Sequence, residues 1–244
     1  MISVQHVKKS FGKVEAVRDV SFVARNGQIT GILGPNGAGK TTTLRMVYTV
    51  LRPDAGSVTV DGFDAVRQAQ EVRQRIGALT DSHGIYPRLT ARENIRYYGR
   101  LHGLEGRELE ERIEALAAVL DMQEFIDRRT EGFSNGQRVK VSIARALVHN
   151  PQNVLLDEPT NGLDVMSTRS MREFIRRLRE EGKCVLFSSH IMQEVSALCD
   201  QIVIISNGLV TASGTPDEIR LATGKENLED AFVAAIGSEE GLIK

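Results

Sequence analysis

The sequence has little of what marks a secreted or membrane-spanning chain. It contains only two cysteines, Cys184 and Cys199, and the first lies in an apolar run, so both are expected to be reduced and inert. The N-terminal segment lacks the apolar region of a signal peptide, and no stretch approaches the ~18 uninterrupted apolar residues of a membrane helix. If the protein acts at a membrane, we therefore expect it to act from outside the bilayer.

An excess of charge of one sign is also absent. The chain of 244 residues carries 31 basic and 32 acidic residues, a net charge of −1, which does not favour a nucleic-acid partner. One predicted helix is rich in arginine but is interleaved with Glu173, Glu180 and Glu181, which is typical of a solvated amphipathic face. Its arginines are Arg169, Arg172, Arg176, Arg177 and Arg179. Partners must therefore be inferred from local motifs.

Hydrophobic periodicity divides the chain into three kinds of segment. Alternating apolar residues predict antiparallel strands at 2–7 and 16–22, and a further strand at 57–60. Short apolar runs predict strands at 28–33, 153–157, 184–188 and 201–205. Helical spacing predicts helices at 41–51, 165–179 and 191–198, a mostly helical region from about 64 to 118, and a helix after the turn at 213–216.

These segments predict an α/β fold. Because strands and helices alternate in the core, its sheet should be mostly parallel, with an N-terminal antiparallel β subdomain. A helical insert is expected at about 82–150 within a unit of residues 1–225, followed by a short C-terminal helix and tail at 226–244. One face of the helical region carries Leu109, Ile113, Leu116 and Leu120.

A glycine-rich phosphate-binding motif stands between a predicted strand and a predicted helix. It matches G-x-x-x-x-G-K-[ST], and its residues are Gly34, Pro35, Asn36, Gly37, Ala38, Gly39, Lys40 and Thr41, followed by Thr42. Glycines let backbone N–H groups turn toward phosphate oxygens, and the helix start adds its positive end. Lys40 is expected to neutralise the β and γ phosphates of ATP, and the Thr41 hydroxyl to ligate Mg²⁺.

A second motif places two carboxylates at the end of an apolar strand. Asp157 and Glu158 follow residues 154–156, at the strand end where open parallel sheets bind ligands. Asp157 is suited to hold the shell of the magnesium ion through water, and Glu158 to accept a proton from the attacking water or align it. These two motifs alone leave kinases, GTPases, helicases and recombinases open.

A third segment narrows the choice of family. In residues 133–138, Phe-Ser-Asn-Gly-Gln-Arg, Ser134 is a good helix N-cap, and its hydroxyl and the Gly136 N–H offer another phosphate-binding helix terminus. Residues 156–164, Leu-Asp-Glu-Pro-Thr-Asn-Gly-Leu-Asp, follow about twenty residues later. Together they resemble the signature motif, Walker B strand and D-loop of ABC transporter ATPases.

This resemblance covers almost the whole chain and implies a RecA-like P-loop NTPase core. It implies that Phe11 stacks on adenine, with a cross-strand core aromatic as the alternative, and that His190 senses the γ-phosphate. It also implies that Ser134, Gly136, Gln137 and Asp164 contact nucleotide. In this family, ATP is held between the P-loop of one cassette and the signature serine of another, so the cassettes form a head-to-tail dimer, from two copies or two different chains. ATP hydrolysis then drives separate transmembrane permease subunits.

The resemblance also implies a peripheral position on the cytoplasmic face of the membrane. In detail, the sequence is most similar to the exporter branch associated with sodium efflux, antibiotics or lipids. Residues 84–94, with Tyr97 and Tyr98 one helical face later, are candidates for a groove that accepts a partner helix, with ordinary core packing as the alternative.

Two positions depart from the family pattern. Asp81 stands where a glutamine is usual, and an aspartate there can still reach Mg²⁺ directly or through water. Asn135 stands where glycine is usual in the signature motif, which affects close packing against the opposing γ-phosphate.

The runner-up function is a non-transport ABC ATPase of DNA repair or ribosomes. Repair relatives carry a long coiled coil between the P-loop and Walker B, and ribosomal ones usually join two cassettes; this sequence has neither. A simple nucleotide kinase does not explain the signature motif and D-loop.

Overall fold

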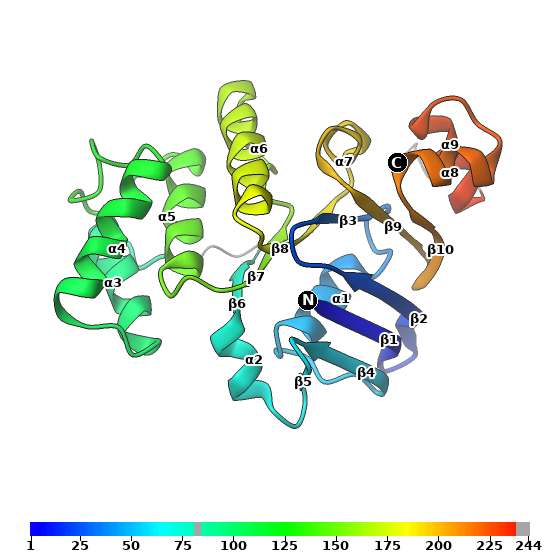
Figure 1. The fold of residues 1–244 in the computed structure, drawn as a ribbon, viewed down its shortest axis with the longest axis horizontal. Coiled ribbons are helices and arrows are strands. Elements are labelled where there is room, and N and C mark those ends of the chain that lie inside the picture. The colour runs from blue at the N-terminus through cyan, green and yellow to red at the C-terminus, as the bar shows by residue number, and fades with distance from the viewer. Residues whose placement is uncertain (81–83, 238–244) are drawn as a thin grey trace.

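The computed structural model describes residues 1–80 and 84–237, and one sheet of ten strands runs through this part of the chain (Figure 1). The strand order is β5-β4-β1-β2-β10-β9-β3-β8-β7-β6. The strands are β1 (Ile2–Phe11), β2 (Val14–Ala24), β3 (Ile29–Leu33), β4 (Ala55–Val60), β5 (Phe63–Asp64), β6 (Ile76–Leu79), β7 (Asn153–Asp157), β8 (Cys184–Ser189), β9 (Gln201–Ser206) and β10 (Leu209–Gly214).

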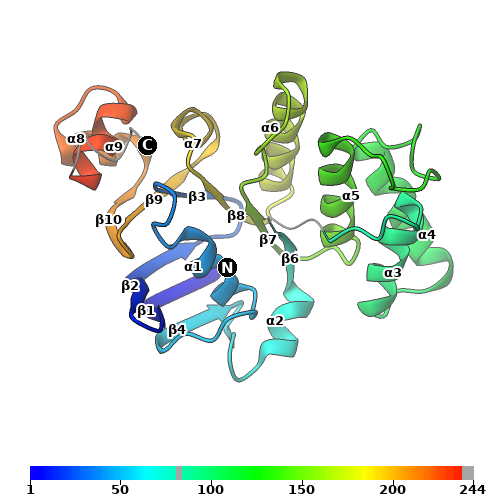
Figure 2. The same cartoon turned by 180° about the vertical axis from the view of Figure 1, so that it is seen from behind.

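The helices lie on both faces of this sheet and at one end of it (Figures 1 and 2). They are α1 (Lys40–Val47), α2 (Ala69–Arg75), α3 (Ala91–Leu101), α4 (Gly106–Val119), α5 (Asn135–Leu147), α6 (Val165–Glu180), α7 (Met192–Leu198), α8 (Pro216–Thr223) and α9 (Leu228–Ile236). Seen from either side, α3, α4 and α5 group together, apart from the antiparallel strands β1, β2 and β4.

The pairing of the strands confirms the predicted α/β class. β9, β3, β8, β7 and β6 pair in parallel, whereas β1 pairs antiparallel with both β2 and β4. β10 joins the two parts, because it runs antiparallel to β9 and touches β2 at Leu209 and Asp19. The core sheet is therefore mostly parallel, with an antiparallel N-terminal portion.

Alternate residues of the parallel strands feed two hydrophobic layers. Ile29 and Leu33 of β3 pack with residues of α5, α6, α7 and α9, while Ile32 packs with α1 and the antiparallel strands. This is the period of two that a strand buried on both faces requires. The two cysteines are free and lie in this core, and burial raises the pKa of Cys184 to about 11, so its thiol stays protonated at neutral pH.

The structure differs from the sequence predictions in three details. The helical region from about 64 to 118 contains β6, a strand of only four residues beside β7, too short to show a period. The helix expected at 41–51 ends at Val47, because Thr49 adopts a φ of 65° and the N–H groups of residues 50 and 51 turn back to Arg45. The hairpin strand β10 was not predicted.

Close approach of α3 and α4 depends on a glycine. A Cβ on Gly99 of α3 would lie 2.3 Å from the Leu109 side chain of α4. Leu109, Ile113 and Leu120 are buried in this region, and Leu116 packs partly buried against them, as the predicted apolar face requires. At the surface of the same pair, Arg96 is paired with Glu110 at 2.6 Å.

The order of the parallel strands gathers the motifs at one edge. Leu33 of β3 lies opposite Ser189 of β8, and Asp157 of β7 lies opposite Ser188. The segments that follow β3, β7 and β8 therefore start side by side. These segments carry the glycine-rich loop, Glu158 and His190 respectively.

Gly39 closes the glycine-rich loop against β2, and its replacement tests this packing. Its φ is +104°, and an added Cβ would lie 2.5 Å from the carbonyl oxygen of Ala16. Gly37 has a φ of +79° but open space around its Cβ position, so Gly37→Ala is a matched control for backbone strain alone. We expect Gly39→Ala to lower the free energy of unfolding by ~1–3 kcal/mol more than the control, measured by urea unfolding. Equal losses would show that β2 does not constrain the loop.

Candidate functional site

A cavity of about 610 Å³ opens at the carboxyl ends of β3, β7 and β8. Most of the predicted phosphate-site residues line it together with two that the sequence did not single out as ligands, Ala16 and Asn161. The lining consists of Phe11, Ala16, Asn36, Gly37, Ala38, Gly39, Lys40, Thr41, Thr42, Asp157, Glu158, Asn161 and His190. Asn161 lies within the 156–164 motif, whereas no local signal marks Ala16, whose carbonyl oxygen lies beside Gly39.

Lys40 is anchored by the loop that precedes it. Its ammonium donates hydrogen bonds to the carbonyl oxygens of Gly34 at 2.7 Å and Pro35 at 3.2 Å, and the side chain is 6% exposed. Burial lowers the pKa of Lys40, and the neighbouring carboxylates of Glu158 and Asp157 oppose that shift. Gly34 and Pro35 thus serve the site through backbone oxygens and do not themselves line the cavity.

Glu158 is held from two sides. Its Oε1 lies 3.6 Å from Lys40 Nζ, and its Oε2 lies 2.9 Å from His190 Nδ1. Its backbone has a φ of +49°, a conformation that costs a residue with a Cβ about 1–2 kcal/mol. A carboxylate fixed in this way, at the wall of a polar cavity, has the position required of a general base.

Asp157 carries an oxygen that the described residues leave unpaired. Thr41 Oγ1 donates to Asp157 Oδ1 at 3.2 Å, and Oδ2 is buried without a hydrogen-bond partner among residues 1–80 and 84–237. A carboxylate oxygen and a hydroxyl side by side are the hard oxygen donors that Mg²⁺ prefers. The donor set present therefore fits a magnesium ion.

Phe11 lies at the end of β1 on the rim of this cavity. Its side chain is 49% exposed, and the Lys9 ammonium lies 5.7 Å from the ring centroid. An exposed ring at the mouth of a polar cavity offers a face on which a planar base can stack. The alternative of a cross-strand core aromatic does not hold for this ring.

The residues of the signature turn do not line this cavity. Ser134 is the N-cap of α5 and forms a capping box with Gln137: the Gln137 N–H donates to Ser134 Oγ at 3.2 Å, and the Ser134 N–H donates to Gln137 Oε1 at 3.0 Å. In Figures 1 and 2, α5 stands apart from α1, which follows the glycine-rich loop. Within one chain, the described structure does not bring the two phosphate-binding helix starts together.

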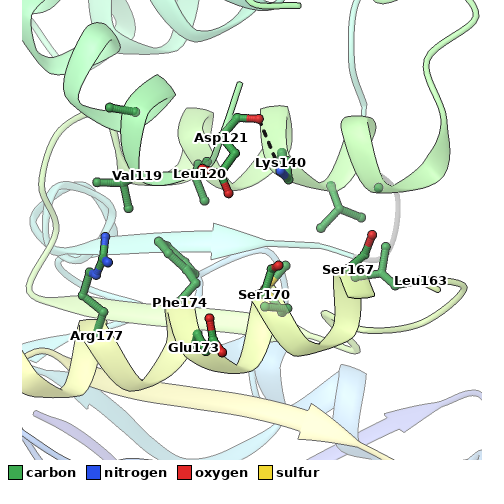
Figure 3. A pocket seen from close by; sticks show the side chains of 14 residues that line it. Val119, Leu120, Asp121, Lys140, Leu163, Ser167, Ser170, Glu173, Phe174 and Arg177 are labelled. Carbon is green, nitrogen blue, oxygen red and sulfur yellow. Dashed lines mark hydrogen bonds between the residues drawn. The ribbon is translucent and has the colours of Figure 1, made fainter. Parts of the chain in front are cut away.

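Gly136 lies where α5 meets α6. It lines a cavity of about 220 Å³ between the end of α4, α5 and α6, and the Ser167 and Leu163 side chains stand beside the first turn of α6 (Figure 3). A Cβ on Gly136 would lie 3.3 Å from Ser167 Oγ. The lack of a side chain at Gly136 therefore eases the contact between the signature helix and α6.

Asn135, which replaces the usual glycine, ties the signature turn to the loop after β7. Its Nδ2 donates to the carbonyl oxygens of Asn161 at 3.2 Å and Gly162 at 3.1 Å. Asp164 then caps α6 by accepting from the Ser167 N–H at 2.7 Å, and the hydrogen bonds from Ser167 lower the pKa of Asp164. Asp81, the predicted additional magnesium ligand, lies outside the described residues.

A second groove, of about 540 Å³, lies between α2 and β6 on one side and α3 and α5 on the other. Tyr98 and Leu101 line it, whereas Tyr97 packs edge-on against Tyr86 with ring centroids 5.5 Å apart. His102 and His149 stack in it at 3.6 Å, and burial lowers the pKa of His149 to about 4. His149 is therefore neutral at pH 7, and the stacked rings do not repel.

Two arginines of the arginine-rich helix α6 form ion pairs, one within the helix and one with the residue before β9. Arg169 pairs with Glu173 at 3.4 Å, and Arg179 pairs with Asp200 at 3.1 Å.

Within the described ranges, no helix has the length and apolar character needed to cross a membrane.

Comparison with known proteins identifies the family. The sequence profile of ABC transporters matches residues 17–161. The ABC transporter ATP-binding protein NatA of Bacillus subtilis (strain 168) is 50% identical over 224 residues, which cover 91% of this chain and 91% of that protein. The linearmycin resistance ATP-binding protein LnrL of the same strain is 34% identical, over 98% of this chain and 79% of that protein.

Solved structures agree with the sequence relatives. An ATP-binding subunit of an ABC transporter superposes with a TM-score of 0.89 at 27% identity, covering 96% of this chain and 99% of that one. A dimeric ATP-binding cassette in a post-hydrolysis state, bound to ADP and Pi, superposes with a TM-score of 0.81 at 25% identity, covering 88% and 98%. Motifs, fold and relatives agree, and the chain belongs to the ABC transporter family as an ATP-binding subunit that hydrolyses ATP.

Proposed function

We propose that this chain drives an exporter from the cytoplasmic face of the membrane, as a peripheral subunit beside separate transmembrane permease subunits. The names of its relatives, among them the linearmycin resistance protein and the Nod factor export ATP-binding protein I of Ralstonia nicotianae, support the export direction. The observation that supports ATP hydrolysis as the source of energy is Glu158, fixed between Lys40 and His190 at the wall of a cavity lined by the phosphate-binding loop.

Different residues of the cavity contact different parts of ATP. Phe11 stacks on the adenine, while the backbone of residues 34–39 and the start of α1, with Thr42, surround the phosphates. Lys40 brings a buried positive charge to the β and γ phosphates, and its burial reduces screening of the attraction by water. Thr41 and Asp157 hold Mg²⁺, which when bound neutralises the charge that develops on the phosphates.

Hydrolysis needs a water aligned on the γ-phosphate. Glu158 Oε2 accepts from His190, which fixes the plane of the carboxylate, and the carboxylate then takes the proton of the attacking water. His190 is 40% exposed at the cavity and stands beside the phosphate position as well as the base. It therefore couples the position of the base to the presence of the γ-phosphate.

A second cassette completes the site. Ser134 is exposed and does not line the cavity of its own chain, so we infer that it reaches nucleotide across an interface between two cassettes. We propose a head-to-tail dimer in which Ser134, Gly136, Gln137 and Asp164 of one cassette face the P-loop of the other. The dimeric post-hydrolysis cassette among the solved structures supports the pairing of two cassettes.

The groove between α2 and α3 is the proposed docking site of the permease. Tyr98 and the 64% exposed Leu101 offer an apolar surface, and Arg73 adds positive charge beside it. An amphipathic helix with an acidic residue fits this combination. Asp81 shortly precedes α3 in the sequence. We propose that it contacts Mg²⁺ and that docking of the permease affects this contact.

We also propose that residues 1–225 form the ATPase unit, with the helical insert at about 82–150, and that 226–244 is an appended tail. The three helices α3, α4 and α5 stand between β6 and β7 in the chain, which supports the insert. Helix α9 of this tail packs against the main core, where its Leu228, Ala231 and Phe232 are buried.

Replacing the base tests the catalytic assignment. In Glu158→Gln, the amide cannot take a proton, so turnover should fall at least ~100-fold while ATP binding persists and traps a dimer. Steady-state phosphate release and size-exclusion chromatography with ATP measure the two effects. Unchanged turnover would refute the role of Glu158.

Two further variants separate the halves of the proposed site. Adding Ser134→Arg to Glu158→Gln should abolish the ATP-trapped dimer but leave ATP binding within about threefold, because Ser134 is exposed and its cap is worth only ~1 kcal/mol. Adding Lys40→Ala to Glu158→Gln instead should abolish both the dimer and ATP binding. A dimer that persists in the double variant with Ser134→Arg would contradict the head-to-tail arrangement.

A charge in the groove tests permease docking. Leu101→Glu should abolish co-purification with the permease from membranes, because it buries a carboxylate in the interface, yet leave the ATPase activity of the isolated subunit within about twofold. Leu221→Glu on α8 is the matched control, since Leu221 is 82% exposed and lies outside the groove. Equal recovery of both variants with the permease would exclude this groove as the docking site.

A further inference from the structure

Ser188 is the first of two buried serines, Ser188 and Ser189, that end the otherwise apolar strand β8. It follows Val185, Leu186 and Phe187 in β8, and its side chain is completely buried. The sequence motifs give it no task, because the recognised residue of this segment is His190. A buried hydroxyl requires hydrogen-bond partners, so its partners indicate what it does.

The partners of Ser188 are the two acidic residues of the site. Ser188 Oγ lies 2.5 Å from Asp157 Oδ1 and accepts a hydrogen bond from the Glu158 N–H at 3.1 Å. The Ser188 carbonyl oxygen also accepts from the Glu158 N–H, at 3.3 Å. Because a hydroxyl has one proton and the Glu158 N–H supplies its own, the Ser188 proton must go to Asp157.

This geometry decides which oxygen of Asp157 is available. Oδ1 accepts from both Ser188 and Thr41, whereas Oδ2 is buried and unpaired within residues 1–80 and 84–237. If Thr41 turned its hydroxyl to a magnesium ion, Ser188 would still hold Oδ1. The carboxylate would then keep its orientation, with Oδ2 presented to the metal shell.

The same hydroxyl supports the strained backbone of Glu158. A φ of +49° is unfavourable for a side-chain-bearing residue, and such a conformation persists only where surrounding contacts determine it. The hydrogen bonds from the Glu158 N–H to Ser188 Oγ and to the Ser188 carbonyl are such contacts. The Ser188 hydroxyl therefore contacts both Asp157, the proposed magnesium residue, and Glu158, the proposed general base.

We propose that Ser188 is a positioning residue that orients Asp157 toward Mg²⁺ and Glu158 toward the attacking water. This inference rests on the proposed function, because it takes Asp157 as the magnesium residue. It predicts that removing the hydroxyl weakens the response to Mg²⁺ more than it weakens the fold or the binding of free nucleotide.

The neighbouring strand offers a matched control. Thr30 of β3 is also completely buried, but its Oγ1 has no hydrogen-bond partner in the described part of the chain. Thr30→Val therefore removes a buried hydroxyl without breaking a hydrogen bond, whereas Ser188→Ala breaks two. Both variants leave the recognised motif residues untouched.

The experiment measures binding of a fluorescent ATP analogue, once in EDTA and once in Mg²⁺. In the parent protein, Mg²⁺ should tighten binding. Ser188→Ala should reduce that gain about tenfold, as loss of a partner behind a metal ligand does, with affinity in EDTA within about twofold of the parent. Its kcat should fall at least tenfold, with KM for ATP changed less. Thr30→Val should match the parent in all these measurements.

The outcomes separate the two proposals. A parent protein whose binding gains nothing from Mg²⁺ would refute the magnesium role of Asp157 itself. If Mg²⁺ tightens binding equally in the parent and in Ser188→Ala, the role of Ser188 is refuted and that of Asp157 is not. Equal weakening in EDTA and Mg²⁺, with a lower unfolding temperature, would reduce Ser188 to a packing residue. If the alanine variant does not fold, Ser188→Cys keeps the size, weakens the hydrogen bond and gives the same comparison.

Discussion

The parallel pairing of β3, β7 and β8 is the constraint on which the site depends. Each strand ends in a different functional segment, and the register places Asp157 opposite Ser188 and Leu33 opposite Ser189. A slip of one residue would turn every side chain of a strand to the other face. The hydrophobic layers on both faces of these strands therefore fix the geometry of the cavity as well as the stability of the core.

Much of this arrangement follows from the sequence, because the relevant signals are local. The strand Asn153–Asp157 has its predicted bounds, since five buried residues stand between clear turns. The glycine-rich loop and the N-caps at Ser134 and Asp164 are likewise local patterns. The short strand β6 escaped prediction because four residues are too few to show a period, and its pairing with β7 joins residues distant in the sequence.

Contacts between distant segments are what a single sequence cannot reveal. The hydrogen bond from Ser188 to Asp157 spans 31 positions, and those from Asn135 to Asn161 and Gly162 span 26 and 27. Asn135 shows the effect clearly. In the sequence, this residue is only an exception to the usual glycine. In the structure, its side-chain amide donates two hydrogen bonds to the loop after β7.

The two halves of the site differ in how far they are organised within one chain. Lys40 and Asp157 are buried, hydrogen bonded and close to each other's charge, while Ser134 and Asp164 are helix caps that are not buried. Buried donors act more strongly on an anion than solvated ones do, and fixed groups lose little freedom on binding. The P-loop half is therefore ready to bind a phosphate before assembly. The signature half gains comparable strength only when a second surface excludes water from it, so cassette pairing follows the binding of nucleotide to the P-loop half and depends on it.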